Sequence, residues 1–268
     1  MTAPLLQPAL YQLRLFFIAL QFFTRLPIPR WVGFDPAWLH HAARYFPAVG
    51  IVVGAVAAGV YWLAALLWSP AIAVLLSTAA GIYLTGAFHE DGLADMCDGF
   101  GGGSTPARVL EIMQDSRIGA YGAIGIVLML GLKCVALGSL PTASVVPALL
   151  IAHPLSRLAA VSLIWRMAYA KAQGKAKPLA QTMSNLEFLI AASTVGIVVL
   201  VVLYCGAMVW GVVMAGSAAA LIATCWLARK CVVRIGGFTG DCLGAVQQVA
   251  ELAFYLGMLA AMRWLPLL

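Results

Sequence analysis

Long apolar runs limit what this chain can fold into more than any other feature of its sequence. A transmembrane α-helix needs roughly 20 consecutive, mostly apolar residues. Only 10% of the residues are charged, whereas soluble domains carry about 25%. Apolar runs that reach or exceed the membrane-spanning length lie at residues 46–68, 119–140, 143–165, 186–228 and 244–265. The sequence therefore predicts an all-α, polytopic integral membrane protein.

The runs predict about seven transmembrane helices in a single domain that covers residues 1–268. The run at 186–228 is too long for one helix, so we expect a hairpin that turns near residues 206–211. A shorter run at 71–88 supplies another span. Residues 10–28 are apolar but carry two arginines and end at prolines, which favours an amphipathic helix in the membrane interface over a cleavable signal peptide.

Basic residues gather in the segments between the predicted spans. With a cytoplasmic N-terminus, thirteen of the sixteen Lys and Arg residues fall in the inner segments, which are 1–45, 89–118, 166–185 and 229–243. The short outer turns hold none, in agreement with the positive-inside rule. This topology places an acidic loop at 88–122 and the polar loop at 229–243 on the same, cytoplasmic, side.

Topology also explains the net charge of +6. A basic patch interleaved with aromatic residues is absent, so we expect the bilayer, and no nucleic acid, as a partner. The sequence leaves a homo-oligomer open. The six cysteines form no CxxC pair, and we expect them to be small packing residues. His40 and His41 are adjacent and do not share a helix face, so we expect them in a solvated connector.

Six of the ten acidic residues lie between residues 88 and 122. Among them, Asp91, Asp95 and Asp98 are spaced to share one face of a helix. Carboxylates held that close repel one another, and a divalent cation relieves the repulsion. Mg²⁺ prefers oxygen ligands and is usually bound by one or two carboxylates plus substrate phosphates. We therefore predict a magnesium site at these aspartates, with Asp115 as a further ligand. The alternative is a solvated acidic helix face.

Neighbouring residues supply candidate catalytic and phosphate-binding groups. His89 and Glu90 stand beside the first aspartate and are candidates for proton transfer or for supporting the metal ligands. A glycine-rich loop follows, and its backbone N–H groups can approach phosphate oxygens closely. A flexible linker is an equal alternative for this loop. The candidate phosphate-binding glycines are Gly99, Gly101 and Gly102.

Basic residues near or inside the spans are candidates for binding phosphate. Arg117 lies close to the acidic run, whereas Lys133 and Arg157 lie inside predicted spans. A buried Arg in a membrane helix needs a partner and therefore marks a functional-site hypothesis. A structural ion pair with one of the aspartates is the alternative. We expect His153, one turn from Arg157, to be a satisfied interior polar group.

The last polar loop contains a second candidate site. Asp241 follows Thr239 and Gly240 on the predicted cytoplasmic side, where it could act as a second ligand or as a base. Thr239 and Gly240 are candidates for contact with phosphate. The alternative role for Asp241 is the N-cap of the last helix.

Together these motifs resemble the cobalamin synthase family, the adenosylcobinamide-GDP ribazoletransferases. The opening ALQFFTRLP at 19–27 is similar too, and the likeness runs over essentially the full length. The motifs that carry the resemblance are HEDGLAD at 89–95, DG at 98–99, EIM at 111–113, DSR at 115–117, GAYG at 119–122 and TGDCLGA at 239–245.

The resemblance implies a Mg²⁺-dependent phosphotransferase of the bacterial inner membrane that acts on a nucleotide-activated corrinoid. Its implied substrates are adenosylcobinamide-GDP and α-ribazole or α-ribazole 5′-phosphate. The implied products are adenosylcobalamin, or its 5′-phosphate, and GMP. In such a reaction a ribose hydroxyl attacks the cobinamide-side phosphorus, and the metal with nearby Arg or Lys would stabilise the charge that develops on phosphate oxygens.

Two other functions use similar features. CDP-alcohol phosphatidyltransferases also carry an Asp-rich cytoplasmic loop, but their DGxxAR opening departs here, where Asp95 rather than Arg follows Ala94. A cation transporter would be expected to place its carboxylates near the bilayer midplane, whereas these lie at a loop edge. Both functions remain alternatives at this point.

Overall fold

The computed structural model describes residues 6–33, 35–170 and 182–264, and in these ranges it is helical without strands. Two short 3₁₀ helices, η1 and η2, flank α2. The elements in chain order are α1 Leu6–Phe23, η1 Arg30–Val32, α2 Pro36–Ala42, η2 Ala43–Tyr45, α3 Phe46–Ala65, α4 Pro70–Thr85, α5 Phe88–Gly102, α6 Pro106–Ile112, α7 Ala120–Ser139, α8 Thr142–Arg166, α9 Asn185–Tyr204, α10 Trp210–Ile235 and α11 Gly240–Trp264.

The helices confirm the predicted all-α membrane architecture. In the described residues, six helices are long and apolar enough to cross a bilayer, and the bent pair of α4 and α5 makes a seventh if it is counted as one span. The predicted hairpin is α9 and α10. Large apolar side chains stay exposed on the outside of the bundle, for example Leu128 on α7 and Leu200 on α9. Exposed apolar side chains on spans of this length are suited to lipid.

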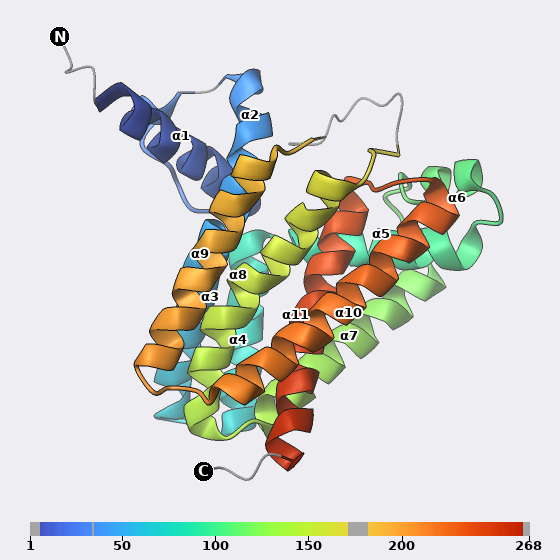
Figure 1. The fold of residues 1–268 in the computed structure, drawn as a ribbon. Coiled ribbons are helices and arrows are strands. Elements are labelled where there is room, and N and C mark those ends of the chain that lie inside the picture. The colour runs from blue at the N-terminus through green and yellow to red at the C-terminus, as the bar shows by residue number, and fades with distance from the viewer. Residues whose placement is uncertain (1–5, 34, 171–181, 265–268) are drawn as a thin grey trace.

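The long helices form one tilted bundle, with α10 packed along α11 and α3 along α8 (Figure 1). Helices α1, α2, α5 and α6 gather at one end of this bundle, and the C-terminal end of α11 lies at the other. Helix α5 runs across the bundle instead of along it. We call the end that carries α5 the α5 end.

Two segments predicted as polar loops are largely helical, and for the first of them the helical spacing of Asp91, Asp95 and Asp98 agrees with this. The segment 88–122 holds α5 and α6, and the segment 229–243 holds the end of α10 and the start of α11. Only residues 236–239 separate these last two helices, because Gly236 ends α10 in a left-handed conformation (φ 74°). Polar residues at the end of a spanning helix continue the helix beyond the apolar run. Of the basic loop 166–185, residues 171–181 lie outside the described residues.

His40 and His41 are exposed, as predicted, although they lie in the short helix α2 rather than in a loop. His41 Nδ1 lies 2.7 Å from Oε1 of Glu187, and Arg44 donates to the same oxygen at 2.5 Å. Glu187 also completes a capping box with Ser184 at the start of α9. The connector is therefore fastened to the bundle at the α5 end.

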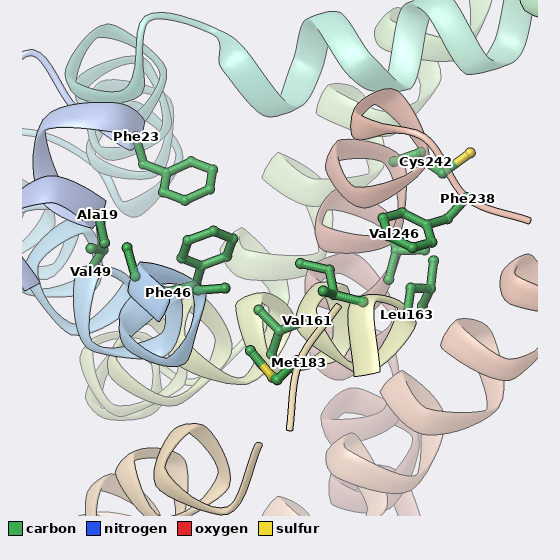
Figure 2. Packing of buried hydrophobic residues seen from close by; sticks show 14 of the residues in the cluster. Ala19, Phe23, Phe46, Val49, Val161, Leu163, Met183, Phe238, Cys242 and Val246 are labelled. Atoms are coloured by element: carbon green, nitrogen blue, oxygen red, sulfur yellow. The ribbon is translucent and has the colours of Figure 1, made fainter. Parts of the chain in front are cut away.

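A hydrophobic core lies beneath α5 at this end (Figure 2). Phe23 of α1 packs edge-on against Phe46 of α3, with ring centroids 4.4 Å apart. On the α11 side, Phe238 and Cys242 are fully buried in the same cluster. Cys242 thus packs as predicted for the cysteines, whereas Cys205 and Cys225 are exposed.

Candidate functional site

A sharp corner between α4 and α5 sets the direction of the acidic helix. Gly86 (φ 65°) and Ala87 (φ 61°) are both left-handed, and they turn the chain by 88°. A left-handed conformation costs a non-glycine residue about 1–2 kcal/mol, so the surrounding structure must hold Ala87 in place. The end of α1 contributes to this, because the backbone N–H of Arg25 donates to the carbonyl of Leu84 at 2.9 Å.

Two of the three aspartates of the predicted acidic face, Asp91 and Asp95, reach the outer side of α5, whereas Asp98 is buried. Asp91 is exposed and Asp95 is half-buried, one turn apart. His89 and Glu90 are buried on the interior side of the same helix. The His89 ring stacks on Phe23 with centroids 5.6 Å apart. The structure thus separates the two candidate proton-transfer residues from the exposed aspartates.

Helix α11 crosses α5 at two glycines. A Cβ on Gly92 would lie 3.0 Å from the Cα of Asp241, and a Cβ on Gly244 would lie 3.1 Å from the carbonyl oxygen of His89. The backbones therefore meet directly at this crossing. The approach brings the backbone of Asp241 against Gly92, the residue that follows Asp91, although about 150 residues separate the two contacting positions in the chain.

The loop before α11 is fixed by a short backbone bridge. Phe238 donates to the carbonyl of Ala168 at 3.0 Å, and Ala170 donates back to Phe238 at 2.9 Å. Burial, together with the nearby carboxylate of Asp241, raises the pKa of Tyr169. The bridge holds the loop against the segment that follows α8.

Thr239, and not Asp241, fills the capping position at the start of α11. The N–H of Cys242 donates to the Thr239 hydroxyl at 3.4 Å. The same hydroxyl lies 3.2 Å from Oδ2 of Asp241. Asp241 sits in the first turn, where the helix dipole favours a negative charge. The alternative prediction that Asp241 is the N-cap of α11 is therefore wrong, because Thr239 occupies that position.

Asp98 turns toward the start of α7. Its two carboxylate oxygens accept hydrogen bonds from the backbone N–H groups of Gly119 at 2.7 Å and Gly122 at 2.8 Å. A side chain at either glycine would collide with this carboxylate. Asp98 thus joins α5 to the N-terminus of α7, where unpaired N–H groups need acceptors.

Asp115 and Arg117 pair with each other in the connection between α6 and α7. Arg117 donates from Nη2 to Oδ2 of Asp115 at 2.7 Å and from Nε to Oδ1 at 3.0 Å. These hydrogen bonds lower the pKa of Asp115 to about 2. Both side chains are exposed at the α5 end.

The predicted phosphate-binding glycines lie inside α5 rather than in a loop. The N–H groups within a helix donate to carbonyls four residues earlier, so they are engaged in this conformation. Gly99 gives room to Met113, and Gly101 gives room to the ring of Tyr121. Gly102, at the end of α5, is exposed. Close packing explains the first two glycines without phosphate.

A buried polar cluster lies behind α5, within the bundle. Nζ of Lys133 on α7 lies 2.7 Å from Oε1 of Glu251 on α11, and both side chains are buried. Gln247 donates to Glu251 at 2.8 Å, and Gln248 donates to Glu90 at 2.9 Å. The cluster therefore connects the interior face of α5 with the interior of α11.

A small cavity lies at the centre of this cluster. Its volume is about 20 Å³, room for about one water molecule. Arg157 lines it, and its Nη1 donates to the carbonyl of His153 at 3.0 Å. Within the described chain, four buried atoms of the residues lining this cavity have no hydrogen-bond partner. They are Oε2 of Glu90, Nδ1 of His153, Nε of Arg157 and Oε1 of Gln248. His153 is buried as expected, and its Nδ1 lies 3.8 Å from Oε2 of Glu251.

Sequence reasoning missed the α11 members of the cluster, Gln247, Gln248 and Glu251. Their signal was present, because polar residues one turn apart in a predicted span are unusual. Lys133 and Arg157, predicted to bind phosphate, belong to this interior cluster. The acid that pairs with Lys133 is Glu251, where the alternative named an aspartate of the acidic run.

The exposed side of α5 offers an oxygen-rich donor set for a hard cation. No group of three or more His, Cys, Asp or Glu in metal-binding geometry occurs in the described part of the chain. Mg²⁺ commonly uses one or two carboxylates and completes its shell with water and phosphate. Asp91 and Asp95, one turn apart on α5, would supply the two carboxylates of such a site. Asp98 fits it less well because its side chain is buried, and Asp115 lies in the connection between α6 and α7 rather than on α5.

The chain matches one protein family along most of its length. Residues 15–259 match the family described as cobalamin-5-phosphate synthase. A Leptothrix cholodnii protein named adenosylcobinamide-GDP ribazoletransferase is 49% identical, over 94% of this chain and 97% of its own length. Relatives with the same name from Ralstonia pickettii and Vibrio cholerae are 50% and 44% identical, each over more than 90% of both chains. No solved structure matches the chain.

Proposed function

Because the chain belongs to the cobalamin-5-phosphate synthase family, we propose that it transfers ribazole to adenosylcobinamide-GDP. The acceptor hydroxyl belongs to α-ribazole or its 5′-phosphate. A new P–O bond forms between that hydroxyl and the cobinamide-side phosphorus, and the bond to GMP breaks. Family membership favours this reaction over CDP-alcohol phosphatidyl transfer and over cation transport.

The observation that carries the placement of the site is the glycine crossing of α5 and α11. It sets the backbone of Asp241 against Gly92, the residue that follows Asp91, and Asp95 lies one turn beyond Asp91 on α5. The resemblance motifs HEDGLAD and TGDCLGA thus form one structural unit at the α5 end. We place the reaction on the exposed side of this unit.

Asp91 and Asp95 are the residues that we propose hold Mg²⁺ there, with Asp241 nearby as a further carboxylate. The ion, when bound, would neutralise charge that develops on the phosphate oxygens. Asp241 is our candidate to take the proton of the attacking hydroxyl, because it is only partly buried and lies at the crossing. Thr239 positions Asp241 through its hydroxyl.

His89 and Glu90 take a different role in this proposal. Both are buried, and Glu90 accepts a hydrogen bond from Gln248 in the interior cluster. We propose that they fix the orientation of α5 rather than transfer protons. Arg117 lies at the same end and is available to approach phosphate if it exchanges its contact with Asp115.

We further propose that the α5 end faces the cytoplasm of a bacterial inner membrane. The curated relatives come from bacteria. Arg25, Arg44, Arg108 and Arg234 lie on segments at this end, as the positive-inside rule requires of a cytoplasmic face. Nucleotide-activated substrates would then reach the site directly from the cytoplasm.

GMP release by the purified protein in liposomes tests the proposal. We expect GMP to appear with adenosylcobinamide-GDP and α-ribazole in the presence of Mg²⁺, and no reaction with EDTA. Asp91→Asn and Asp95→Asn should each lower kcat by about 10²-fold or more, the typical loss when transition-state charge is left unstabilised. A shift of the Mg²⁺ concentration needed for half-maximal rate would accompany the loss if the residues hold the ion.

Asp35→Asn is the matched control, because it is the same chemical change on the segment before α2 and away from the crossing. It should leave GMP release unchanged. If the Asp91→Asn variant released GMP at the wild-type rate, the proposal that Asp91 binds Mg²⁺ would be wrong. Transfer from CDP-diacylglycerol, or ion flux without GMP, would overturn the proposed reaction itself.

A further inference from the structure

An apolar groove lies between α5, α7, α10 and α11. It has a volume of about 560 Å³. Met96 and Phe100 of α5 form its back wall, and Leu128 and Leu132 of α7 form one side. The other side comes from α10, where Trp226 and Lys230 line it.

The groove is separate from the proposed reaction site. At 100° per residue, Met96 and Phe100 lie on the face of α5 roughly opposite to Asp91 and Asp95. The groove also opens among side chains that face the bilayer: Leu128 is 60% exposed and Leu132 is 49% exposed. A molecule in the groove would enter from the membrane and contact the rear of α5.

Positive charge marks one end of the groove. Lys230 is exposed, and its Nζ lies 5.9 Å from the ring centroid of Trp226. Arg234, one turn further, donates to the carbonyl of Gly103 at 2.6 Å and lies over the ring of Phe100. The stretch from Trp226 to Arg234 covers about 12 Å of helix, so the groove runs from the charged end of α10 toward the bilayer interior.

We propose that this groove binds one anionic phospholipid, with an acyl chain along the apolar walls and the phosphate at Lys230. Apolar walls, a side opening toward lipid and a basic end at the membrane surface together match the two parts of such a molecule. The amide-rich periphery of a corrinoid is less suited to these walls. The bound acyl chain supports Met96 and Phe100 and so holds α5 from behind. This site goes beyond the proposed transferase activity.

Native mass spectrometry tests the site on full-length protein released from vesicles of phosphatidylglycerol and phosphatidylcholine in equal amounts. The wild-type protein should retain one phosphatidylglycerol in preference to phosphatidylcholine. Lys230→Gln should lower that preference about fivefold, the fold-change that follows from losing one basic residue at a membrane surface. Arg229→Gln is the matched control, because Arg229 is an exposed neighbour on the same helix that does not line the groove.

Equal retention of the two lipids by the wild-type protein would overturn the proposal. So would equal losses in Lys230→Gln and Arg229→Gln, which would indicate a general effect of surface charge. Displacement of the retained lipid by one equivalent of adenosylcobinamide-GDP would assign the groove to substrate instead. A Leu128→Trp variant that narrows the groove should also lose the lipid, and its retention there would contradict the placement of the acyl chain.

Discussion

We expect Lys133→Met to lower the free energy of unfolding by about 3 kcal/mol, the lower end of the range for removing one partner of a buried ion pair. Lys133 and Glu251 approach within 2.7 Å, and their side chains are 7% and 0% exposed. After the substitution, Glu251 keeps hydrogen bonds from Tyr255 at 3.0 Å and Gln247 at 2.8 Å. These two donors place the loss at the lower end, because the carboxylate stays partly compensated.

The attraction between the charges of Lys133 and Glu251, rather than the hydrogen bond between them, should account for most of this loss of stability. Two unit charges 2.7 Å apart attract by about 6 kcal/mol at an effective dielectric constant of ~20. Desolvation offsets part of that attraction. A neutral interhelical hydrogen bond in a membrane protein contributes only about 0.6 kcal/mol. The double variant Lys133→Met/Glu251→Gln removes both charges and keeps an amide beside Tyr255 and Gln247, so it should be more stable than Lys133→Met alone.

A double-mutant cycle measures the coupling directly. The wild-type protein, the two single variants and the double variant are unfolded by SDS in mixed micelles, with tryptophan fluorescence as the signal. We expect a coupling energy of about 2 kcal/mol or more. Arg229→Met, at an exposed arginine of α10 that does not line the apolar groove, is the control and should change stability by less than about 0.5 kcal/mol. A coupling energy at or below about 0.6 kcal/mol would refute the reasoning, because a neutral hydrogen bond would then account for the contact.

Two further predictions concern the α5 end. Asp98→Ala removes the acceptor for the N–H groups of Gly119 and Gly122, so it should lower the free energy of unfolding by about 3 kcal/mol in the same SDS titration. Asp91→Asn should lower it by less than about 0.5 kcal/mol. Equal losses in the two variants would contradict the anchoring role of Asp98. The hydrogen bonds from Arg117 keep the pKa of Asp115 at about 2, below its ordinary 3.8, so the contribution of this pair to stability is complete above pH 3.8 and is lost as the pH falls toward 2. Arg117→Gln should raise the pKa of Asp115 toward 3.8, as followed by the ¹³C shift of its carboxyl carbon, and an unchanged pKa would show that Arg117 is not the cause.

Apolar periodicity was enough to predict the spans, because helix length and burial in lipid are local properties of a segment. The ends of α7 and α8 agree with their apolar runs to within a few residues. The direction in which a helix runs cannot be predicted from apolar periodicity in the same way. Hydropathy treats residues 88–102 as a break in the apolar pattern and does not show that Gly86 and Ala87 turn the chain by 88° into another helix. The segment was therefore predicted as a connecting loop, although the spacing of its aspartates indicated a helix within it.

The sequence also did not show which charged residues of different transmembrane helices contact one another. Lys133, Arg157 and Glu251 are visible as charges within apolar runs, and each indicates an interior site. Which of them meet depends on how α7, α8 and α11 rotate against one another, and that is decided by packing over the whole bundle. The phosphate-binding role for Lys133 was a reasonable hypothesis without that rotation, but its contact with Glu251 places it in the interior cluster.

The glycines illustrate the same limit and sharpen the role of the acidic helix. Gly99 and Gly101 were interpreted as room for phosphate, yet they give room to Met113 and Tyr121. Gly92 and Gly244, to which no role was assigned, give room to another backbone. A Cβ at Gly92 would lie 3.0 Å from the Cα of Asp241, so even alanine would force α11 away from α5. Two motifs far apart in the sequence thus depend on one crossing. The interior cluster contacts one side of α5 and the crossing holds its start, so the exposed Asp91 and the half-buried Asp95 lie on a helix anchored at both contacts, as the proposed phosphate-transfer site would require.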